Sequence, residues 1–585
     1  MLLSKGSSRK EFLHQNKLQD AATEEQDSQD AIRRGRSEQI RDWPNEAGFQ
    51  ALHEETVPVN LTVEGSFPKY TQGVLYRTGP GSWKVENPGK KDFNCSHWFD
   101  GFVHSHRFEI TSQTSGKSPT SVIYTSRSQA KPLIEALRQN PELGMSFGQK
   151  QDPCVGVFGK LMSIFKSKIV ARPAEQHNLG VTVLPNHPGF QNKGDEKTTS
   201  GHNPDIKNVW LGTDNSLMMK MDPISLKVEG FASQKDMNPE LSGPIACAHS
   251  QRDHLTGDLY NFNLAFGKEA VYKVFRVSAH TGETDILATL SGPRILPAYI
   301  HSFFLTDDFV VLAIWSSHFG LNGLKIMWNQ NILDGIDPFD KSKAVKWLVI
   351  DRKHGKGLVA EFDSEAAFSF HTVNAWQESS SNGTFNIICD VICYDSLDIL
   401  HSLYYTNIRS EGEGAVTFAN EKGDSSRSHF ARFRLTSIDP SRPLVRGPKV
   451  TAPLAEELFR VKSPHTGDLP TINPLFSTRR SRYVYTLVNR GYSAFIDGIS
   501  KFDTETRNTI FWDNPFGHTP GEAIFVPNPD GTEEDDGVLL SVILDGIKGT
   551  SYLVCLSAKT MEEVGKASVG SAVALGFHGT FVAGN

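Results

Sequence analysis

Hydrophobic and polar positions alternate along most of this chain in short runs that end at polar turns. Clear examples are VYKVFRVSAHTGETDILATL at 271–290, VKWLVIDRKHGKGLVAEF at 345–362 and GISKFDTETRNTIFWD at 498–513. Alternation with Gly, Asn and Asp at the turns is typical of antiparallel hairpins. The hairpins recur along the chain, and sustained helical periodicity is scarce. The pattern therefore predicts an all-β fold built from the blades of a β-propeller, not a sandwich.

Two stretches depart from this pattern. Residues 1–42 are polar, highly charged and poor in aromatics, which predicts a disordered or loosely structured extension ahead of one propeller domain at 43–585. Residues 152–170 have the pattern of a short amphipathic helix. Such a helix either lies on a membrane surface or packs on the propeller as an ordinary surface helix. The apolar side chains expected to make the membrane contact are Phe158, Leu161, Met162 and Phe165.

The composition of the chain argues against several classes of protein. The 585 residues are 38% hydrophobic and 22% charged, a globular balance, and the net charge of −7 without a basic patch argues against nucleic-acid binding. No apolar run reaches the roughly 20 residues of a membrane-spanning helix, and the first residues lack the apolar stretch of a secretory signal. Six cysteines are too few for a disulfide scaffold of this length. We expect a cytoplasmic protein with buried thiols, and no required protein partner is evident.

Four histidines stand where an apolar run meets a turn: His249 in ACAHSQRD, His301 in PAYIHSFFLTDDF, His371 in AFSFHTVNAW and His578 in ALGFHGTF. A neutral imidazole is a common ligand of iron, zinc and copper. The alternative is that each is an ordinary core residue held by hydrogen bonds. The chain has 20 histidines, and for any one of them taken alone this structural role is the commoner one. The axis of a propeller is where side chains from distant blades converge, so the predicted fold favours one shared metal.

Several motifs together resemble those of the carotenoid cleavage oxygenases, a family that includes apocarotenoid oxygenases, a retinoid isomerase and stilbene-cleaving enzymes. The resemblance runs from about residue 58 to the C-terminus. It rests on YRTGPGSW at 76–83, HWFDGFVHSHRFEI at 97–110, the segments around His301, His371 and His578, and GEAIFVPNPDGTEEDDGVLLSVIL at 521–544. The segment at 152–170 matches the membrane-contact segment of animal members, which favours the membrane interpretation.

The resemblance implies a seven-bladed β-propeller with a helical and loop cap over an iron site and a substrate tunnel. It makes His249, His301, His371 and His578 the four ligands of a non-haem Fe(2+). Family members orient their ligands with three glutamates, and matching the motifs puts Glu522, Asp214 and Asp468 at these positions. Two of the three acids are thus one methylene shorter than usual, which requires a closer backbone, a bridging water or a shifted alignment.

Other residues near these motifs receive weaker assignments. His97, His104 and His106 are not expected to bind metal, and Trp98, Phe99, Asp100 and Gly101 are expected to be structural. Tyr299, Phe303 and Trp376 sit beside ligand histidines and either line the substrate tunnel or pack in the core. No acid–base dyad or nucleophile is expected beyond the metal centre.

The resemblance implies an Fe(2+)-dependent dioxygenase that uses O2 to cleave a carbon–carbon double bond in a carotenoid and yields aldehydes, acting from a peripheral membrane surface. In HWFDGF, Gly101 is followed by Phe102. This variant looks most like fungal torulene-cleaving members, so torulene is the favoured substrate. Cleavage of a stilbene, isomerisation of a retinoid, and a propeller scaffold without catalysis stay open as alternatives.

Overall fold

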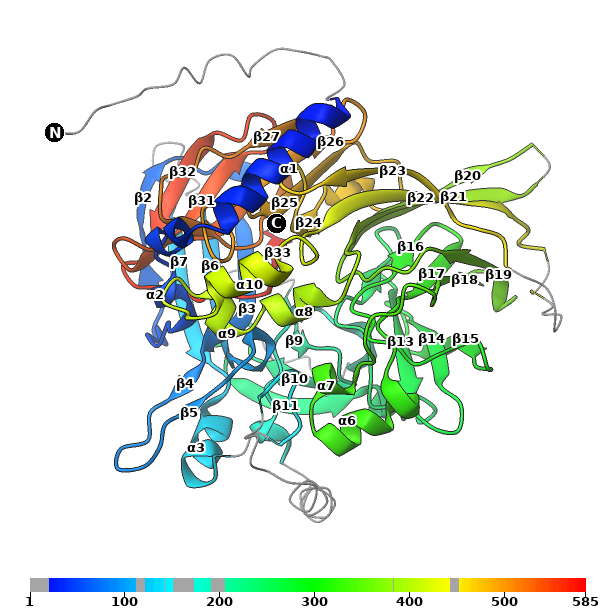
Figure 1. The fold of residues 1–585 in the computed structure, drawn as a ribbon, viewed down its shortest axis with the longest axis horizontal. Coiled ribbons are helices and arrows are strands. Elements are labelled where there is room, and N and C mark those ends of the chain that lie inside the picture. The colour runs from blue at the N-terminus through cyan, green and yellow to red at the C-terminus, as the bar shows by residue number, and fades with distance from the viewer. Residues whose placement is uncertain are drawn as a thin grey trace.

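The computed structural model describes residues 20–111, 121–141, 144–150, 173–190, 206–381, 383–441, 444 and 452–584. The membrane-contact residues Phe158, Leu161, Met162 and Phe165 lie outside these ranges. Among the described residues, no helix is both long and apolar enough to cross a membrane. The predicted class is confirmed: seven antiparallel sheets surround a central axis as the blades of a propeller (Figure 1).

Three blades lie between residues 182 and 364 and use consecutive strands. Each is a four-stranded antiparallel sheet whose order follows the chain, forwards or backwards. They comprise β8 (Thr182–Pro185), β9 (Val209–Gly212), β10 (Leu217–Met221) and β11 (Val228–Ser233); β12 (Gln251–Arg252), β13 (Leu259–Ala265), β14 (Val271–Val277) and β15 (Thr284–Leu290); and β16 (Phe304–Leu305), β17 (Phe309–Ile314), β18 (Val345–Asp351) and β19 (Leu358–Ser364).

Two further four-stranded blades follow in the second half, with the same antiparallel order. Their central strands are almost wholly buried, because both faces of a blade pack against neighbouring blades. They comprise β20 (Thr372–Ser379), β21 (Phe385–Cys393), β22 (His429–Ile438) and β23 (Glu456–Lys462); and β24 (Asp468–Thr471), β25 (Tyr483–Val488), β26 (Gly498–Asp503) and β27 (Thr509–Phe511).

The last two blades close the ring by combining strands from both ends of the chain. One has the order β1-β7-β6-β3-β33, and the other has β2 at the edge of β32-β31-β30, with β28 and β29 both pairing β30. Thr78 of β3 lies opposite His578 of β33. The strands are β1 (Val59–Asn60), β2 (Thr62–Gly65), β3 (Gly73–Ser82), β6 (Phe102–Thr111), β7 (Ser121–Ser128), β28 (His518–Pro520), β29 (Ile524–Pro527), β30 (Gly537–Asp545), β31 (Thr550–Ser557), β32 (Glu563–Ser568) and β33 (His578–Ala583).

Short helices and one hairpin interrupt the blades and form the expected cap. Figure 1 shows α7 to α10 in front of the ring of blades. The hairpin is β4 (Lys84–Val85) with β5 (Phe93–Asn94). The helices are α2 (Glu46–Phe49), α3 (Lys131–Gln139), α5 (Gln234–Met237), α6 (Leu324–Asn329), α7 (Ile332–Gly335), α8 (Asp398–Ser402), α9 (Tyr405–Ile408) and α10 (Ala415–Lys422), with 3-10 turns η3 (Lys69–Thr71), η4 (Trp98–Asp100), η5 (Ala174–Gln176), η6 (Pro188–Phe190), η7 (Gly320–Gly323) and η8 (Pro474–Phe476).

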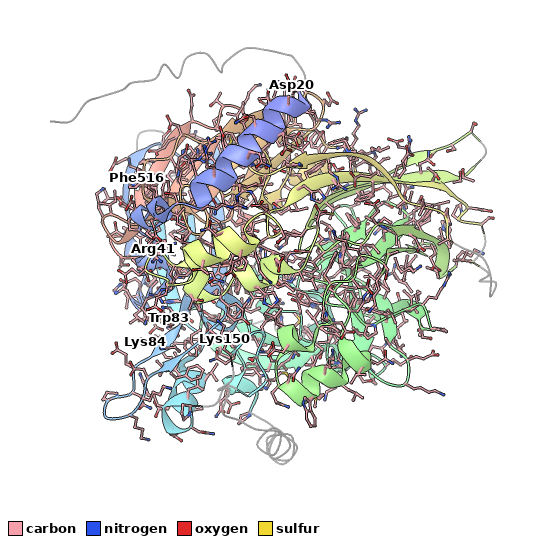
Figure 2. All side chains as sticks on the ribbon, in the orientation of Figure 1. Asp20, Arg41, Trp83, Lys84, Lys150 and Phe516 are labelled. Carbon is pink, nitrogen blue, oxygen red and sulfur yellow. The ribbon has the colours of Figure 1, made fainter. Side chains whose placement is uncertain are left out.

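The described part of the N-terminal extension is more ordered than its composition predicted. Helix α1 (Ala21–Gly35) begins at Asp20, whose side chain accepts a hydrogen bond from the backbone N–H of Thr23, and 3-10 helix η2 (Glu38–Asp42) follows (Figure 2). Arg34 donates two hydrogen bonds to the carbonyl of Arg490. Composition alone could not predict this docking, because the partners lie more than 400 residues away.

Candidate metal centre

Each of the four histidines stands at or just before the innermost strand of a blade. His578 begins β33, His371 precedes β20, and His301 and His249 come shortly before β16 and β12. These strands lie next to the axis, where β33 contacts β8 and β16 contacts β20. The alternation of apolar runs and turns therefore delivers one imidazole from each of four blades to the same end of the axis.

The structure brings the four imidazoles together. One ring nitrogen of each lies within 4.8 Å of the others, and His301, His371 and His578 are buried. The Nε2 atoms of His249 and His578 are 3.0 Å apart, and those of His371 and His578 are 3.3 Å apart. No neighbouring cysteine or carboxylate joins this group of ligand atoms among the described residues.

Three of the imidazoles have a carboxylate behind them. Nδ1 of His301 is 2.8 Å from Asp214, Nδ1 of His371 is 2.7 Å from Asp468, and Nδ1 of His578 is 2.7 Å from Glu522. The contacts of both aspartates are direct. The shorter side chain thus reaches its histidine without a bridging water.

The donor set fits a bound cation. A carboxylate at Nδ1 holds the imidazole proton there and leaves a lone pair on Nε2. In His371 and His578 both lone pairs then face each other across 3.3 Å, where neither nitrogen can donate to the other. A divalent transition metal between them turns this repulsion into coordination.

The electrostatics of the site favour neutral imidazoles. Burial lowers the pKa of His578 to about 4 against the opposing effect of Glu522, and burial together with the other three imidazoles lowers the pKa of His249 well below its usual value. Burial alone would raise the pKa of Glu522, but His578 and Arg77 hold it below its usual value. His249 and His578 are thus neutral and Glu522 is ionised near neutral pH, as metal binding requires.

The outer partners of the carboxylates were not predicted. The Tyr299 hydroxyl donates to Asp214 Oδ2 at 2.9 Å, and the Tyr394 hydroxyl donates to Asp468 Oδ2 at 2.5 Å. Glu522 instead accepts from the backbone N–H of Gly579 at 2.7 Å and lies 3.4 Å from Arg77. Tyr394 carries no sequence signal of its own, since it lies 74 residues from its partner.

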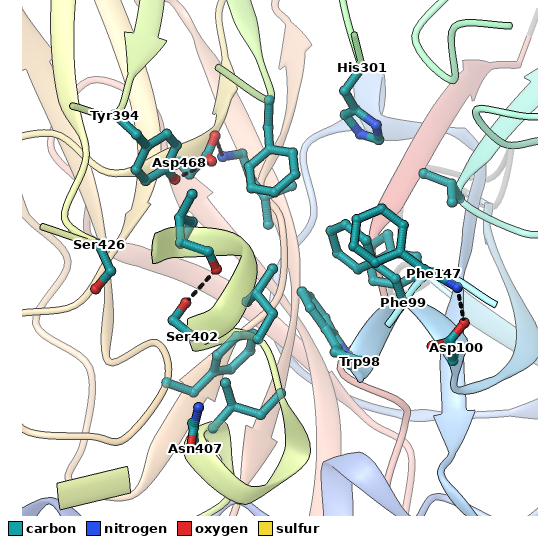
Figure 3. Close-up of a pocket in the computed structure, with 18 of the residues that line it drawn as sticks. Trp98, Phe99, Asp100, Phe147, His301, Tyr394, Ser402, Asn407, Ser426 and Asp468 are labelled. Atoms are coloured by element: carbon teal, nitrogen blue, oxygen red, sulfur yellow. Dashed lines mark hydrogen bonds between the residues drawn. The ribbon is translucent and has the colours of Figure 1, made fainter. Parts of the chain in front are cut away.

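A cavity of about 760 Å³ adjoins the histidines, and His301, His371 and His578 form part of its wall. Figure 3 shows Trp98, Phe99 and Phe147 on one side and Tyr394, Asp468 and Ser402 on the other. Its volume is within the range of sites that enclose a small organic ligand. Trp98 and Phe99, predicted to be structural only, also line it.

The three residues considered for the tunnel lie in different surroundings. Tyr299 lines the cavity, but Phe303 and Trp376 are not among its described lining residues. Phe303 packs against Phe262 within the core, with ring centres 6.4 Å apart, and the Trp376 ring lies 4.9 Å from the Arg432 guanidinium. Nearness in sequence to a site histidine did not determine which way these side chains point.

Comparisons with known proteins agree with this geometry. Residues 48–583 match the family model described as retinal pigment epithelial membrane protein. The chain is 45% identical to a carotenoid dioxygenase of Neurospora crassa, covering 96% of this chain and 94% of that one, and 41% identical to a torulene dioxygenase of Fusarium fujikuroi, covering 95% and 96%.

More distant proteins share the architecture. A human mitochondrial carotenoid-cleaving dioxygenase is 26% identical, covering 90% of this chain and 88% of that one. The solved structure of a variant of the Synechocystis apocarotenoid oxygenase superposes with a TM-score of 0.67 at 21% identity, covering 93% of this chain and 99% of that one. The fold is therefore that of the propeller oxygenases.

Proposed function

The chain belongs to the carotenoid oxygenase family, and we propose that its four histidines hold one Fe(2+) for the oxidative cleavage of a carbon–carbon double bond in a carotenoid, with torulene as the favoured substrate. The observation that carries this is the convergence of four imidazoles beside a cavity whose wall includes Trp98, Phe99, Phe370 and Phe577. The names of the fungal relatives support the substrate.

The protein's own part in this reaction is to hold the metal, to orient the imidazole rings and the polyene, and to exclude water. Asp214, Asp468 and Glu522 fix the imidazole rings and keep their proton on Nδ1. The aromatic walls, Trp98 and Phe99 among them, favour an apolar polyene and position it near the histidines. When bound, Fe(2+) supplies the chemistry by which O2 attacks the double bond.

The deciding experiment is a mass-resolved product analysis. Purified, iron-loaded protein in detergent and air is offered torulene, β-carotene, a C30 apocarotenal and resveratrol side by side. A defined aldehyde from torulene supports the proposal and identifies the scissile bond. Cleavage of resveratrol alone moves the protein to stilbene cleavage. No product from an iron-replete protein rejects cleavage and leaves isomerisation or a scaffold role.

We also propose that the protein works in the cytoplasm as a peripheral membrane protein and takes its substrate from the bilayer. Leu321, Leu324, Met327 and Trp328, on η7 and α6, are 70, 66, 47 and 42% exposed. Met327 also lines the cavity, so this apolar surface adjoins the route to the histidines. The described cysteines are free, buried thiols, as a reducing compartment allows.

Sedimentation with liposomes tests this association. Leu324→Glu and Trp328→Glu should release the protein from vesicles, because each places a charge on the surface that enters the lipid. Leu255→Glu is the matched control, since Leu255 is 75% exposed and does not line the cavity. Equal sedimentation of all three variants would contradict the proposal.

A further inference from the structure

His249 is held differently from the other three imidazoles. Each of the others has a carboxylate at Nδ1, whereas no acid of the described residues is bonded to the His249 ring. A carboxylate at this position fixes both the tautomer and the direction of a ligand imidazole. The placement of His249 therefore depends on its backbone and on the segment that carries it into the site.

This segment is irregular, and side chains from other parts of the chain bind its backbone. Residues 246–249 lie ahead of β12, belong to no strand, and are buried except for the last. Asn261 of β13 accepts a hydrogen bond from the N–H of Cys247 at 3.2 Å and donates one to its carbonyl at 2.9 Å. The hydroxyl of Thr182, at the start of β8, donates to the carbonyl of Ala248 at 2.9 Å. Side chains thus replace the ladder that a strand would supply.

Asp214 binds the same segment while it orients another ligand. Its Oδ1 accepts from the N–H of Ala248 at 3.0 Å, and its backbone carbonyl accepts from the N–H of Ala246 at 2.8 Å. Its Oδ2 is the oxygen that faces the ring of His301. The N–H of His249 in turn donates to the carbonyl of His301 at 3.3 Å. The two oxygens of one carboxylate therefore connect the placement of two imidazoles.

A second contact on β13 shows what ordinary backbone support looks like. Asn263, two residues beyond Asn261, accepts from the N–H of Gly243 at 2.8 Å and donates to its carbonyl at 2.9 Å. The two asparagines thus bind backbone in the same way. Gly243, however, neither adjoins a site histidine in the sequence nor lines the cavity. The chain therefore contains a matched control for a contact that only holds backbone.

We propose that Asn261, Thr182 and Oδ1 of Asp214 form a backbone cradle that positions His249 for the metal, in place of the acid that its ring lacks. This inference rests on the proposed function, because it assumes that the four histidines share one metal ion. Neither Asn261 nor Thr182 lines the cavity. They are positioning residues, which act on the ligand through the backbone of residues 247 and 248.

Metal binding without turnover provides the test. Protein stripped of metal by a chelator is titrated with Co(2+), whose visible absorption when bound depends on the number and arrangement of its ligands. Asn261→Ala removes both bonds to Cys247, so we expect the affinity to fall about 10–100-fold and the absorption band to change. Thr182→Val removes one bond and should lower the affinity about 2–10-fold, whereas Thr182→Ser keeps the hydroxyl and should restore it.

Asn263→Ala is the matched control. It should lower stability in urea, as Asn261→Ala does, and keep the affinity and the spectrum of the unmodified protein. Equal changes in both variants would show general destabilisation and overturn the inference, and so would an unchanged Asn261→Ala. If Asn261→Ala does not fold, the two variants of Thr182 decide, and equal affinity in them would overturn the inference.

The unmodified protein separates this inference from the proposed function. If it binds neither Co(2+) nor Fe(2+), both are rejected. If it binds metal with an affinity that does not depend on the backbone cradle, only the cradle is rejected and carotenoid cleavage stands. If binding depends on the cradle but iron-loaded protein yields no aldehyde from torulene, the cradle is supported and the proposed reaction is rejected.

Discussion

Two groups of buried histidines lie in the same propeller and differ in the hydrogen-bond partner of the imidazole ring. In the metal centre, His301, His371 and His578 each face a carboxylate at Nδ1. In the second group, His97 contacts the carbonyl of Leu400 at 2.8 Å, and His106 contacts the Tyr124 hydroxyl at the same distance. In the part of the chain that the structure describes, neither ring has a carboxylate partner.

Burial is common to both groups and therefore does not identify a ligand. It lowers the pKa of His97 and of His187 to about 3 and that of His104 to about 4, as it does for His578. The distinguishing features are convergence from several blades and an acid that sets the tautomer. The predictions below remove these features one at a time, from the largest expected effect to the smallest.

Loss of a converging imidazole should have the largest effect. His371→Ala and His578→Ala should abolish cleavage and lower the iron content of the folded protein to near zero, and His249→Ala and His301→Ala should do the same. The measurement is iron per protein by mass spectrometry. His187→Phe, from the second group, should keep its iron. Full activity in any of the four variants would remove that residue from the ligand set.

Loss of the acid should have an intermediate effect. Asp214→Asn, Asp468→Asn and Glu522→Gln keep the size of the side chain but no longer favour a proton on Nδ1. We expect iron affinity or activity to fall about 10–100-fold in each. Competition with a chelator measures the affinity. An unaffected variant would exclude the orienting role of that acid.

Loss of the hydroxyl behind the acid should have a smaller effect. Tyr394→Phe removes one hydrogen bond to Asp468 and leaves the contact of Asp468 with His371. We expect iron affinity to fall about 2–10-fold, in line with one hydrogen bond. Tyr485→Phe removes a buried hydroxyl that donates to the carbonyl of Ala558 and does not line the cavity, so it should leave affinity unchanged. An equal loss in both variants would indicate general destabilisation.

The histidines of the second group, to which His187 belongs, should mainly affect how stable the fold is at acid pH. His187 is held neutral by burial, so the unfolded state binds more protons than the folded state below a pH of about 6.5. Stability therefore falls as pH is lowered from 6.5 towards 3. In urea unfolding, His187→Phe should lose less stability between pH 7 and pH 5 than the unmodified protein, by up to about 2 kcal/mol. Identical pH profiles would contradict this assignment.

The sequence predicted the propeller and the four histidines because their signals are local. Alternating runs define blades, and His578 in GFHGTF sits where a run begins. The positions of Asp214 and Asp468 came from matched motifs, and their direct contact became visible only in the structure. Tyr394 was missed because its significance depends on its contact with Asp468 of another blade.

Core packing accounts for the surroundings of Phe303 and Trp376, for which the sequence left both tunnel lining and core packing open. Both residues stand near site histidines in the sequence, but the interior of a blade also needs large apolar side chains. The order of α1 was missed for a related reason. Its polar composition describes the isolated segment, whereas contacts such as that of Arg34 with Arg490 exist only after the blades have formed.

The pairing of β3 with β33 has a consequence for synthesis on the ribosome. His578 follows His371 by 207 residues and lies on the last strand described. A nascent chain that has already exposed His249, His301 and His371 still lacks the fourth imidazole and the strand that closes the ring. Closure of the ring and completion of the group of four histidines therefore depend on the same strand, β33.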